Sequence, residues 1–507
     1  MPEITEEAEA PNDAGNDQPA QLDPEKDAES QRSVPATAMR TSRPDLVEFD
    51  GPDDPDNPQN WSKKRKWAIT AAMGGMAFVV TFASSIHSVA IKPVAHEYHI
   101  SQVVSILGVS LFLLGFVFGP IFFGPASEVF GRRVPLFAGY LVFAIFQIPV
   151  AVARNVETIM LGRFFGGFAA SSPLAVVGGA LADIWGPLER AYGVCVFAGA
   201  TFIGPVAGPI VGGFITQSYL GWRWTAWITL IMAALFGSIG LLVIPETSAA
   251  RILQIKAKRL RYETQNWALH AKADERRVDA KSMLTVYLVR PFLMFVQEPI
   301  LALVTAYMSF IYGILYLFFE AFPISFQEER GWNPGVGALP FASFIVGIAM
   351  GTGLIAYSTR TNFTRAFYKE GKIVPEERLP PMMVGAAALP IGLFWFAWTS
   401  NPHIIWVPQV LSVAVMGGGC LLTFWQGMNY IIDCYGFYAN SAIAINTFVR
   451  STAGAGFPLF APAMYHNLGV PWASSLLAFL CVVFFPVPVL FYKYGARIRQ
   501  KSRFKPV

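Results

Sequence analysis

The stretch GATFIGPVAGPIVGG, residues 199–213, lies inside a long apolar run and determines how the rest of the chain is interpreted. Gly204, Gly208 and Gly212 recur at every fourth residue and so lie on one face of a helix. In water this helix would be weak, because glycine and proline are poor residues for a helix interior. In a bilayer it persists, since unpaired backbone groups are costly there, and a stripe of small residues lets a neighbouring helix approach closely. The stretch therefore indicates a tightly packed membrane helix.

The composition of the 507 residues is that of a polytopic membrane protein, with 54% hydrophobic and only 14% charged residues, against about 25% charged in soluble proteins. The net charge of +4 is too small, and the basic residues too scattered, to indicate a nucleic-acid partner. The four cysteines lack metal-ligand spacing, and no GxxxxGKS, GxxxxGKT, HExxH or GxSxG motif occurs. We therefore expect no metal, no cofactor and no enzymatic activity.

Spanning a bilayer takes about 20 apolar residues, and the sequence offers twelve such runs. Six precede a long polar, basic stretch and six follow it, and the fifth and eleventh each carry two prolines four residues apart. We therefore expect an all-α membrane protein of two pseudo-symmetric six-helix bundles. The expected helices cover residues 67–88, 103–124, 134–153, 157–181, 191–216, 222–244, 299–322, 336–357, 380–399, 403–427, 437–464 and 470–492.

The chain is predicted to divide into five parts. Lysine and arginine concentrate in the segments that are cytosolic if the N-terminus is cytosolic, which leaves only Lys92, Arg154, Arg223 and Arg330 outside. By the positive-inside rule both termini are then cytosolic, and we expect a multi-pass protein of the plasma membrane or, alternatively, the vacuolar membrane. The parts are a disordered cytosolic tail (1–62), a first bundle (63–246), a cytosolic linker loop (247–297), a second bundle (298–493) and a cytosolic tail (494–507).

The short loop after the second expected helix groups charges of both signs. It reads GPASEVFGRR, from Gly124 to Arg133, and contains Glu128, Gly131 and Arg132. A carboxylate beside two guanidinium groups can form a charge network at the membrane face and hold two helices together. We therefore predict a gating role for this loop. The plainer alternative is a glycine turn whose arginines only mark the cytosolic side of the membrane, as the positive-inside rule expects.

Three ordered motifs resemble those of the major facilitator superfamily. Residues 124–133 are similar to motif A in its glutamate-containing fungal form, residues 161–169 (LGRFFGGFA) resemble motif B, and residues 199–213 resemble motif C, which is associated with proton-coupled antiporters. The resemblance covers residues 60–495, and its subgroup is the fungal twelve-helix drug:proton antiporters, above all the polyamine, multidrug and secondary-metabolite exporters. The segments that carry the subgroup are DPDNPQNW (54–61), PET (245–247), EAFP (320–323) and NTFVR (446–450).

The resemblance implies a gate at motif A. Glu128 stands where most members carry aspartate, and Val129 stands where a basic residue often follows. The negative charge is retained, so the resemblance implies that Glu128 interacts with Arg132 or Arg133 and with the N-terminal dipole of a helix in the other half. Such contacts would favour the state that is closed to the cytosol.

Proton coupling has three candidate residues. Arg163 lies well inside the fourth expected helix, where an unpaired charge is costly, and the resemblance implies a role in proton transfer. Arginine does not titrate usefully, so another group must carry the proton. Glu320, among aromatic residues near the outer end of the seventh helix, and His87, late in the first, are rival carriers. A glutamate at headgroup level and a hydrogen-bonded packing histidine are the plainer alternatives.

The substrate cavity is expected to be lined by polar and aromatic residues within the spans, although a single aromatic residue there is more often core or interfacial belt. The cluster FWQGMNY, residues 424–430, is the most persuasive part. It combines stacking surface with hydrogen-bond donors, which suits an amphipathic or planar substrate. The candidates are Gln147, Tyr312, Tyr316, Trp425, Gln426, Asn429, Tyr430 and Asn446.

The glycine stripe needs a partner helix, and the eighth helix offers a GxxxG pair. In the superfamily that the motifs resemble, helices five and eight meet across the halves, so a hinge role is expected there, with ordinary close packing as the alternative. The expected seam joins Gly204, Pro205, Gly208, Pro209 and Gly212 to Gly347 and Gly351, and a second seam joins Gly115 and Gly119 of helix two to Gly454 and Gly456 of helix eleven.

These features together predict a proton-coupled secondary transporter that exports a small organic molecule, namely a drug, a toxin or secondary metabolite, or a polyamine, by alternating access. Two alternatives remain open at this point: a nutrient importer or facilitator on the same fold, and a non-transporting membrane sensor. The expected partners are the small-molecule substrate, protons and the lipid bilayer, and the protein is expected to be a monomer.

Overall fold

The computed structural model describes residues 45–186, 189–275, 285–371, 374–500 and 502–504. The chain divides into the units Met1–Leu46 and Val47–Val507. The first unit lies almost wholly outside the described residues, and all that follows concerns the second unit.

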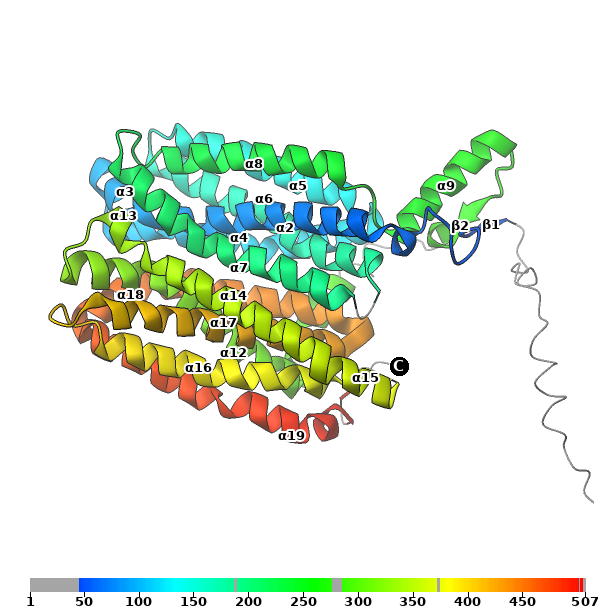
Figure 1. Cartoon of the computed structure of the whole chain (residues 1–507). Coiled ribbons are helices and arrows are strands. Elements are labelled where there is room, and N and C mark those ends of the chain that lie inside the picture. Colours follow the sequence, from blue (N-terminus) through cyan, green and yellow to red (C-terminus); the bar gives the residue numbers. More distant parts are fainter. Residues whose placement is uncertain (1–44, 187–188, 276–284, 372–373, 501, 505–507) are drawn as a thin grey trace, which may run out of the picture. The chain divides into compact units, whose positions relative to one another are not determined.

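The second unit is built almost entirely of helices (Figure 1). The first half contains α2 (Lys63–Ile86), α3 (Ile91–Glu97), α4 (Gln102–Val129), α5 (Arg133–Ala151), α6 (Val156–Ile184), α7 (Arg190–Gln217) and α8 (Trp224–Val243). The second half contains α12 (Pro299–Phe322), α13 (Pro334–Gly337), α14 (Pro340–Ser358), α15 (Thr364–Glu370), α16 (Leu379–Trp398), α17 (Trp406–Tyr435), α18 (Ala439–Phe484) and α19 (Pro486–Gln500).

Shorter elements connect these helices. Between the halves lie α9 (Ala249–Thr264) and α11 (Arg290–Gln297). The two short strands are β1 (Leu46–Val47) and β2 (His270–Ala271). The 3-10 and π turns are η1 (Pro58–Asn60), η2 (His87–Ala90), η3 (Lys272–Glu275), η4 (Thr285–Val289), η5 (Pro323–Glu329), η6 (Thr359–Phe363), η7 (Pro375–Arg378) and η8 (Gly436–Tyr438).

Twelve membrane crossings are present among the described residues, as predicted. Ten helical segments are long and apolar enough to span a bilayer, but the last, Trp406–Gln500, has 95 residues. As one helix it would be about 140 Å long, against about 30 Å for the hydrocarbon core. It contains three crossings, namely α17, residues 439–468, and residues 470–500. The break within α18 falls at Gly469, whose φ of 71° is a conformation that favours glycine.

Each half has its own packing, and helices of the two halves also contact each other. In the first half α2 packs on α7, and α4 and α5 pack on α6; in the second, α18 packs on α12, and α14 and α16 pack on α17. Across the halves, α4 contacts α18 and α7 contacts α14 and α13. The predicted meetings of helices two and eleven and of helices five and eight are therefore confirmed. The helix axes run alongside one another in Figure 1.

Large apolar side chains cover the outer faces of the helices. On α8, for example, Leu242 is 88% exposed and Leu235 56% exposed. Such a surface suits lipid, since helices satisfy their backbone hydrogen bonds internally and present apolar side chains to the hydrocarbon. The polar side chains of Ser84, Arg163 and Tyr316, by contrast, are buried between helices.

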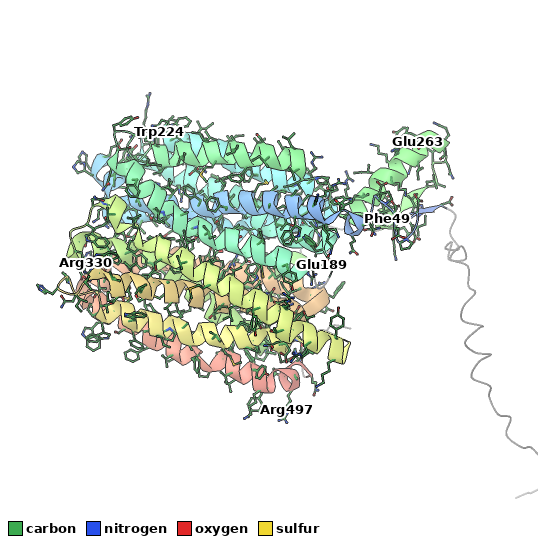
Figure 2. The ribbon with its side chains drawn as sticks, in the orientation of Figure 1. Phe49, Glu189, Trp224, Glu263, Arg330 and Arg497 are labelled. Atoms are coloured by element: carbon green, nitrogen blue, oxygen red, sulfur yellow. The ribbon has the colours of Figure 1, made fainter. Side chains whose placement is uncertain are left out.

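The connections gather at two opposite ends of the helices. Figure 2 shows Trp224 and Arg330 at one end and Glu189 and Arg497 at the other. We call the end with Trp224 the predicted outer end and the end with Glu189 the predicted inner end, following the charge distribution of the sequence. All four basic residues expected outside lie in segments that border the predicted outer end, namely Lys92 in α3, Arg154 between α5 and α6, Arg223 before α8 and Arg330 after η5.

The part of the predicted disordered tail nearest the first helix is folded, which corrects that expectation. Lys256 of α9 forms ion pairs with Asp50 (2.7 Å) and Asp54 (3.4 Å). The backbone N–H groups of Asp50 and Asp56 donate to the Asp54 carboxylate, each at 2.8 Å, and hold its pKa below the usual range. Residues 50–61 therefore form a turn against the linker helix.

The C-terminal tail also begins later than predicted. Helix α19 continues to Gln500, and Arg499 makes a bidentate contact with Glu376 of η7, with both oxygens at 2.7 Å. Ser502 and the backbone N–H of Arg503 then bond Glu298 at the start of α12 (2.9 and 3.1 Å). Paired and charge-assisted contacts of this kind hold residues 494–503 against the second half.

Candidate functional site

A polar contact joins the two halves between α2 and α12. The Ser84 hydroxyl lies 2.7 Å from the Tyr316 hydroxyl, and both side chains are buried. The Tyr312 hydroxyl, one turn earlier on α12, donates to that of Tyr316 at 3.5 Å. Hydroxyl groups buried against apolar surroundings need such partners. The contact is thus a specific point of registration between the halves.

Arg163 of α6 lies directly behind this contact. Its guanidinium donates to the carbonyl oxygens of Gly108 (2.9 Å), Ala83 (2.8 Å) and Ser84 (3.3 Å). Ala83 and Ser84 belong to the last turn of α2, where carbonyl groups lack helical partners and the helix dipole is negative. The arginine is 3% exposed, so its side chain is buried and does not extend to the membrane interface as a snorkelling arginine would. It acts as a cap that fixes the end of α2.

The two candidate proton carriers lie one turn further along these helices. His87 follows Ser84 by three residues, and Glu320 follows Tyr316 by four. Because Ser84 and Tyr316 touch, and α2 and α12 both run from the predicted inner end, the two candidates occupy the same level. His87 is 2% exposed and its Nε2 has no hydrogen-bond partner among the described residues.

Each candidate carrier is buried without an ion-pair partner. The His87 ring fills the space beside Gly108, where a Cβ would come within 2.6 Å of Nε2. Glu320 is 6% exposed, and among the residues that the structure describes its carboxylate has no hydrogen bond or ion pair. A buried group that gains and loses a proton is suited to coupling, and neither residue is distinguished from the other by these contacts.

Tyr312 belongs to an aromatic cluster between the halves. Its ring stacks on that of Phe424 of α17, with centroids 6.0 Å apart. Phe424 in turn packs edge-on against Phe202 of α7, in the first half, at 5.0 Å. The guanidinium of Arg450, on α18, lies 5.2 Å from the Tyr312 ring and 5.0 Å from the Phe424 ring. We call Phe202, Tyr312, Tyr316, Phe424 and Arg450 the central cluster.

Two other predicted lining residues make contacts within one half. The Tyr430 ring stacks on Phe491 of α19 (6.2 Å), and its hydroxyl faces Gly495. The Asn446 amide donates to Thr305 of α12 (3.2 Å). Both side chains are therefore held by helices of the second half.

The remaining predicted lining residues have local contacts. Gln147 donates to the carbonyl of Phe143 in its own helix (3.3 Å). Asn429 donates to Gln426 (3.2 Å), and the buried Trp425 has no partner for its indole N–H among the described residues. A role for these residues in substrate contact stays a prediction.

The glycine stripe of α7 packs within its own half, which corrects the predicted seam. A Cβ on Gly204 would meet Thr81 and the backbone of Phe82 in α2, and one on Gly208 would meet Ser85. Gly212 likewise faces Ile86 and Val89. The prolines Pro205 and Pro209 lie inside α7 without ending it. The stripe therefore presses α2 against α7, and α2 is the helix that carries Ser84.

The other glycines of the predicted seams also face helices of their own half. Gly347 and Gly351 of α14 lie against α17, with Gly418 the nearest shared neighbour. Gly115 and Gly119 of α4 lie against α6. Gly454 makes room for the Tyr312 ring, 2.8 Å from where its Cβ would be, whereas Gly456 faces open space. Close approach is thus used to build each half, and the ordinary packing alternative is the correct one.

Contacts between the halves near the predicted outer end come from different residues. Lys92 of α3 pairs with Glu328 of η5 at 2.8 Å. A Cβ on Gly213, the last glycine of α7, would lie 2.8 Å from the carbonyl oxygen of Pro334 in α13. The exposed ion pair is worth little on its own. Such contacts can open without disrupting either half.

The charged loop after α4 is organised around Glu246 of the PET segment. The Glu246 carboxylate accepts from the backbone N–H groups of Arg132 (2.8 Å) and Arg133 (3.2 Å) at the start of α5, and from that of Ser248 (2.9 Å) before α9. A carboxylate at helix N-termini is favoured by their unpaired N–H groups and dipoles. Gly131 provides the turn, with φ 85° and Glu246 in contact with it.

The side chains of this loop reach both halves. Arg132 pairs with Asp183 of α6 (3.0 Å) and donates to Ser127 (2.9 Å). Glu128 accepts a hydrogen bond from Asn440, at the N-terminus of α18 in the second half (2.9 Å). The implied contact of Glu128 with a helix N-terminus of the other half is therefore present. Gly124 lies within α4 and faces open space.

Sequence reasoning passed over Arg450, Phe202 and Phe424 as individual site residues. Arg450 lies eleven residues into α18, about 16 Å from its start, and the argument that singled out Arg163 applies to it equally. Phe424 entered only as the first residue of the 424–430 cluster, and Phe202 carried no signal, because a phenylalanine in an apolar span is the commonest kind of core residue.

Two six-helix bundles that meet around buried polar side chains form the architecture of a membrane transporter built from repeats. The chain belongs to the Major Facilitator Superfamily, whose family model matches residues 73–458. It is 53% identical to the citrinin biosynthesis cluster transporter mrr1 of Monascus ruber, over 91% of this chain and 92% of that protein. It is 51% identical to the ascochitine biosynthesis cluster transporter of Didymella fabae, over 91% and 89%.

Among solved structures, the proton:xylose symporter XylE bound to 6-bromo-6-deoxy-D-glucose is similar, with a TM-score of 0.61. The match covers 86% of this chain and 96% of XylE at 15% sequence identity. This likeness shows the fold. The chain is accordingly a membrane transporter and not an enzyme.

Proposed function

We propose that this transporter exports a small organic molecule of the secondary-metabolite class in exchange for protons. The observation that carries the proposal is the Ser84–Tyr316 contact between the halves, with His87 and Glu320 one turn beyond it. In this proposal the aromatic rings of the central cluster contact the substrate, and His87 and Glu320 can bind protons. Both sets of residues lie where the two halves move against each other. The relatives named for the citrinin and ascochitine clusters support the substrate class and the direction of transport.

In the proposed cycle a proton enters from outside and neutralises Glu320 or His87. Substrate leaves, the halves rock, and release of the proton to the cytosol restores the binding form. Glu128 contributes by holding Asn440 when the inner end is closed, so the inward-facing state requires that 2.9 Å contact to break. Arg163 contributes by fixing the end of α2, which contains Ser84 and directly precedes His87.

Accumulation of candidate compounds in cells with and without the protein tests the direction of transport. Lower accumulation supports export, higher accumulation supports a nutrient importer, and an unchanged level supports a non-transporting sensor. We expect Glu128→Ala and Arg163→Ala to abolish drug resistance while both variants still reach the cell surface. Normal resistance in both variants contradicts the proposed gating and coupling.

Proton exchange in reconstituted vesicles identifies the carrier. The two test variants are Glu320→Gln and His87→Gln. The variant that replaces the true proton carrier should abolish substrate-driven proton movement but still bind substrate. Glu157→Gln, at an exposed position in the first turn of α6, is the matched control and should behave as wild type. Unchanged proton movement in both carrier variants contradicts the assignment.

We further propose that the protein resides in the plasma membrane as a monomer with both termini in the cytosol. The distribution of lysine and arginine between the two ends supports this orientation. Asn362 begins an Asn-Phe-Thr sequon on the predicted inner side. It should therefore carry no glycan, and a mobility shift on deglycosylation of the purified protein contradicts the orientation.

A further inference from the structure

Arg450 is a half-buried cation whose hydrogen-bonding capacity is left open. Its Nε is buried and has no hydrogen-bond partner, and among the described residues no carboxylate forms an ion pair with it. Its guanidinium instead lies beside the stacked rings of Tyr312 and Phe424, 5.2 and 5.0 Å from their centroids, which are 6.0 Å apart. A guanidinium has five N–H donors, so the rings leave these donors without acceptors.

The position of Arg450 is in the middle of the bundle. It is eleven residues from the start of α18, and Phe424 is eleven residues from the end of α17, so each lies about 16 Å from the predicted inner end. Through Phe424 the cluster reaches Phe202 of the first half, with ring centroids 5.0 Å apart. The open donors therefore lie between the halves, where a transported molecule must pass.

The cations near this position are Arg163 and Arg450, and the carboxylate of Glu320 lies one turn beyond Tyr316. A chain of contacts connects Arg450 to a second cation, Arg163. It runs from Arg450 through Tyr312, Tyr316 and Ser84 to Arg163. Arg163 is satisfied by three backbone carbonyl groups, which neutralise none of its formal charge. A buried cation without a counter-ion is costly in a membrane protein, and such residues mark substrate or ion pathways.

We propose that Arg450 and the rings of Tyr312 and Phe424 form a binding site for a planar, aromatic organic anion, such as an aromatic carboxylate. This inference rests on the proposed export function and specifies its substrate class. The carboxylate takes the open guanidinium donors in a bidentate, charge-assisted contact, while the aromatic ring stacks on Tyr312 or Phe424. A cationic substrate such as a polyamine would meet two guanidinium groups and no described carboxylate in the cluster.

Equilibrium binding to the full-length protein in lipid nanodiscs tests the proposal. The probes are radiolabelled 2-naphthoate, its neutral isostere 2-naphthamide, the cation 2-naphthylmethylammonium, and cyclohexanecarboxylate, which keeps the charge but lacks the aromatic ring. We expect 2-naphthoate to bind roughly tenfold to a hundredfold more tightly than 2-naphthamide, the ratio that a charge-assisted contact supplies. Cyclohexanecarboxylate should fall between them.

Three variants assign the effect to the cluster. Arg450→Gln should reduce 2-naphthoate binding to the level of 2-naphthamide, whereas Arg450→Lys should keep part of the preference because the charge remains but the bidentate geometry is lost. Phe424→Leu should narrow the gap between 2-naphthoate and cyclohexanecarboxylate. Arg259→Gln removes an exposed arginine of α9 that pairs with Glu263, and it should bind all four probes as wild type does.

The proposal is overturned if 2-naphthoate does not bind, if either the amide or the ammonium probe binds as tightly, or if Arg450→Gln retains the anion preference. Export is measured separately as accumulation of the same probes in cells. Cells that export the neutral or cationic probe without binding of 2-naphthoate reject the anion site and keep the exporter. Binding of 2-naphthoate with unchanged accumulation of every probe supports the anion site and rejects the exporter.

Discussion

Two arginines lie deep in apolar spans, Arg163 buried and Arg450 half-buried, and their surroundings differ. Arg163 in the first half directs three N–H groups at backbone carbonyls and stacks on Phe112 at 4.3 Å. Arg450 in the second half lies beside two stacked aromatic rings, and within the described part of the chain its Nε has no acceptor. The first is built into its bundle as a helix cap, and the second keeps donors that only a ligand or water can use.

The difference shows that depth in a span does not by itself assign a role. Both arginines carry the same charge within long apolar helices, but only the backbone carbonyls at the broken end of α2 give Arg163 a structural task. A buried polar group that is satisfied stabilises one arrangement of its neighbours, whereas an unsatisfied one is costly until a partner arrives. We therefore infer that Arg163 holds the coupling site in place and that Arg450 binds the substrate.

The largest expected effect separates the two arginines by stability. Arg163→Gln removes charge-assisted bonds to carbonyls of α2 and α4 and should lower the free energy of unfolding by about 3 kcal/mol. Arg450→Gln removes a buried charge without a counter-ion and should change it by less than about 1 kcal/mol, or stabilise the protein. Thermal unfolding of both variants in nanodiscs measures the difference. Equal losses of stability in the two variants would contradict the different roles inferred for the two arginines.

The second prediction concerns what else holds α2 in place. Gly204→Ala puts a Cβ within 2.7 Å of the Phe78 carbonyl and 2.9 Å of the Phe82 backbone nitrogen. Backbone cannot move aside as a flexible side chain can, so we expect a loss of about 1–3 kcal/mol. Gly456→Ala, at a glycine of α18 that faces open space, is the control and should be neutral. Comparable melting temperatures for the two variants contradict the packing of the stripe on α2.

A smaller change in stability is expected at the hydrogen bond between Ser84 and Tyr316, which joins the two halves. Tyr316→Phe and Ser84→Ala each remove the 2.7 Å hydrogen bond between the halves, and a double-mutant cycle should give a coupling of about 1 kcal/mol. The measurement is thermal unfolding, with substrate transport rates recorded in parallel. A zero coupling energy means that the hydroxyls do not act together, and the registration of the halves then depends on packing alone.

The smallest expected effect is at an exposed charge, His270 in the linker. Its ring nitrogens face the Ala268 carbonyl (2.8 Å) and the Glu275 carboxylate (3.2 Å), and these acceptors raise the pKa of His270 above 6.5. A raised pKa means that the protonated form orders the loop below pH 6.5, and that this order is lost as pH rises through the folded-state pKa.

A spin label measures this change directly. The four native cysteines are buried, so a nitroxide on Ala268→Cys reports the mobility of this loop alone. Its mobility should increase between pH 6 and pH 8, values that bracket the ordinary pKa of about 6.5. The same label in a His270→Gln background is the control and should show no such change. A pH-independent spectrum in the His270 protein contradicts the assignment.

The sequence by itself determined the membrane class, the twelve crossings and the two halves. Hydropathy and length fix these features, because no other structure satisfies the backbone of such apolar runs in lipid. The charged loop was also predictable, since Glu128, Arg132 and Arg133 stand together in a short connection. Its organiser was not: Glu246 is more than 100 residues away in the chain and reaches Arg132 only through the fold.

Only the tertiary structure decided which helix covers each face and which buried charge is satisfied. Periodicity places Gly204, Gly208 and Gly212 on one face but does not say whether α2 or α14 lies against it. Likewise, the sequence places Arg163 and Arg450 in apolar spans without saying that one meets the end of α2 and the other meets two rings. The physical reason is that such contacts join residues distant in sequence, whose proximity depends on the packing of whole helices.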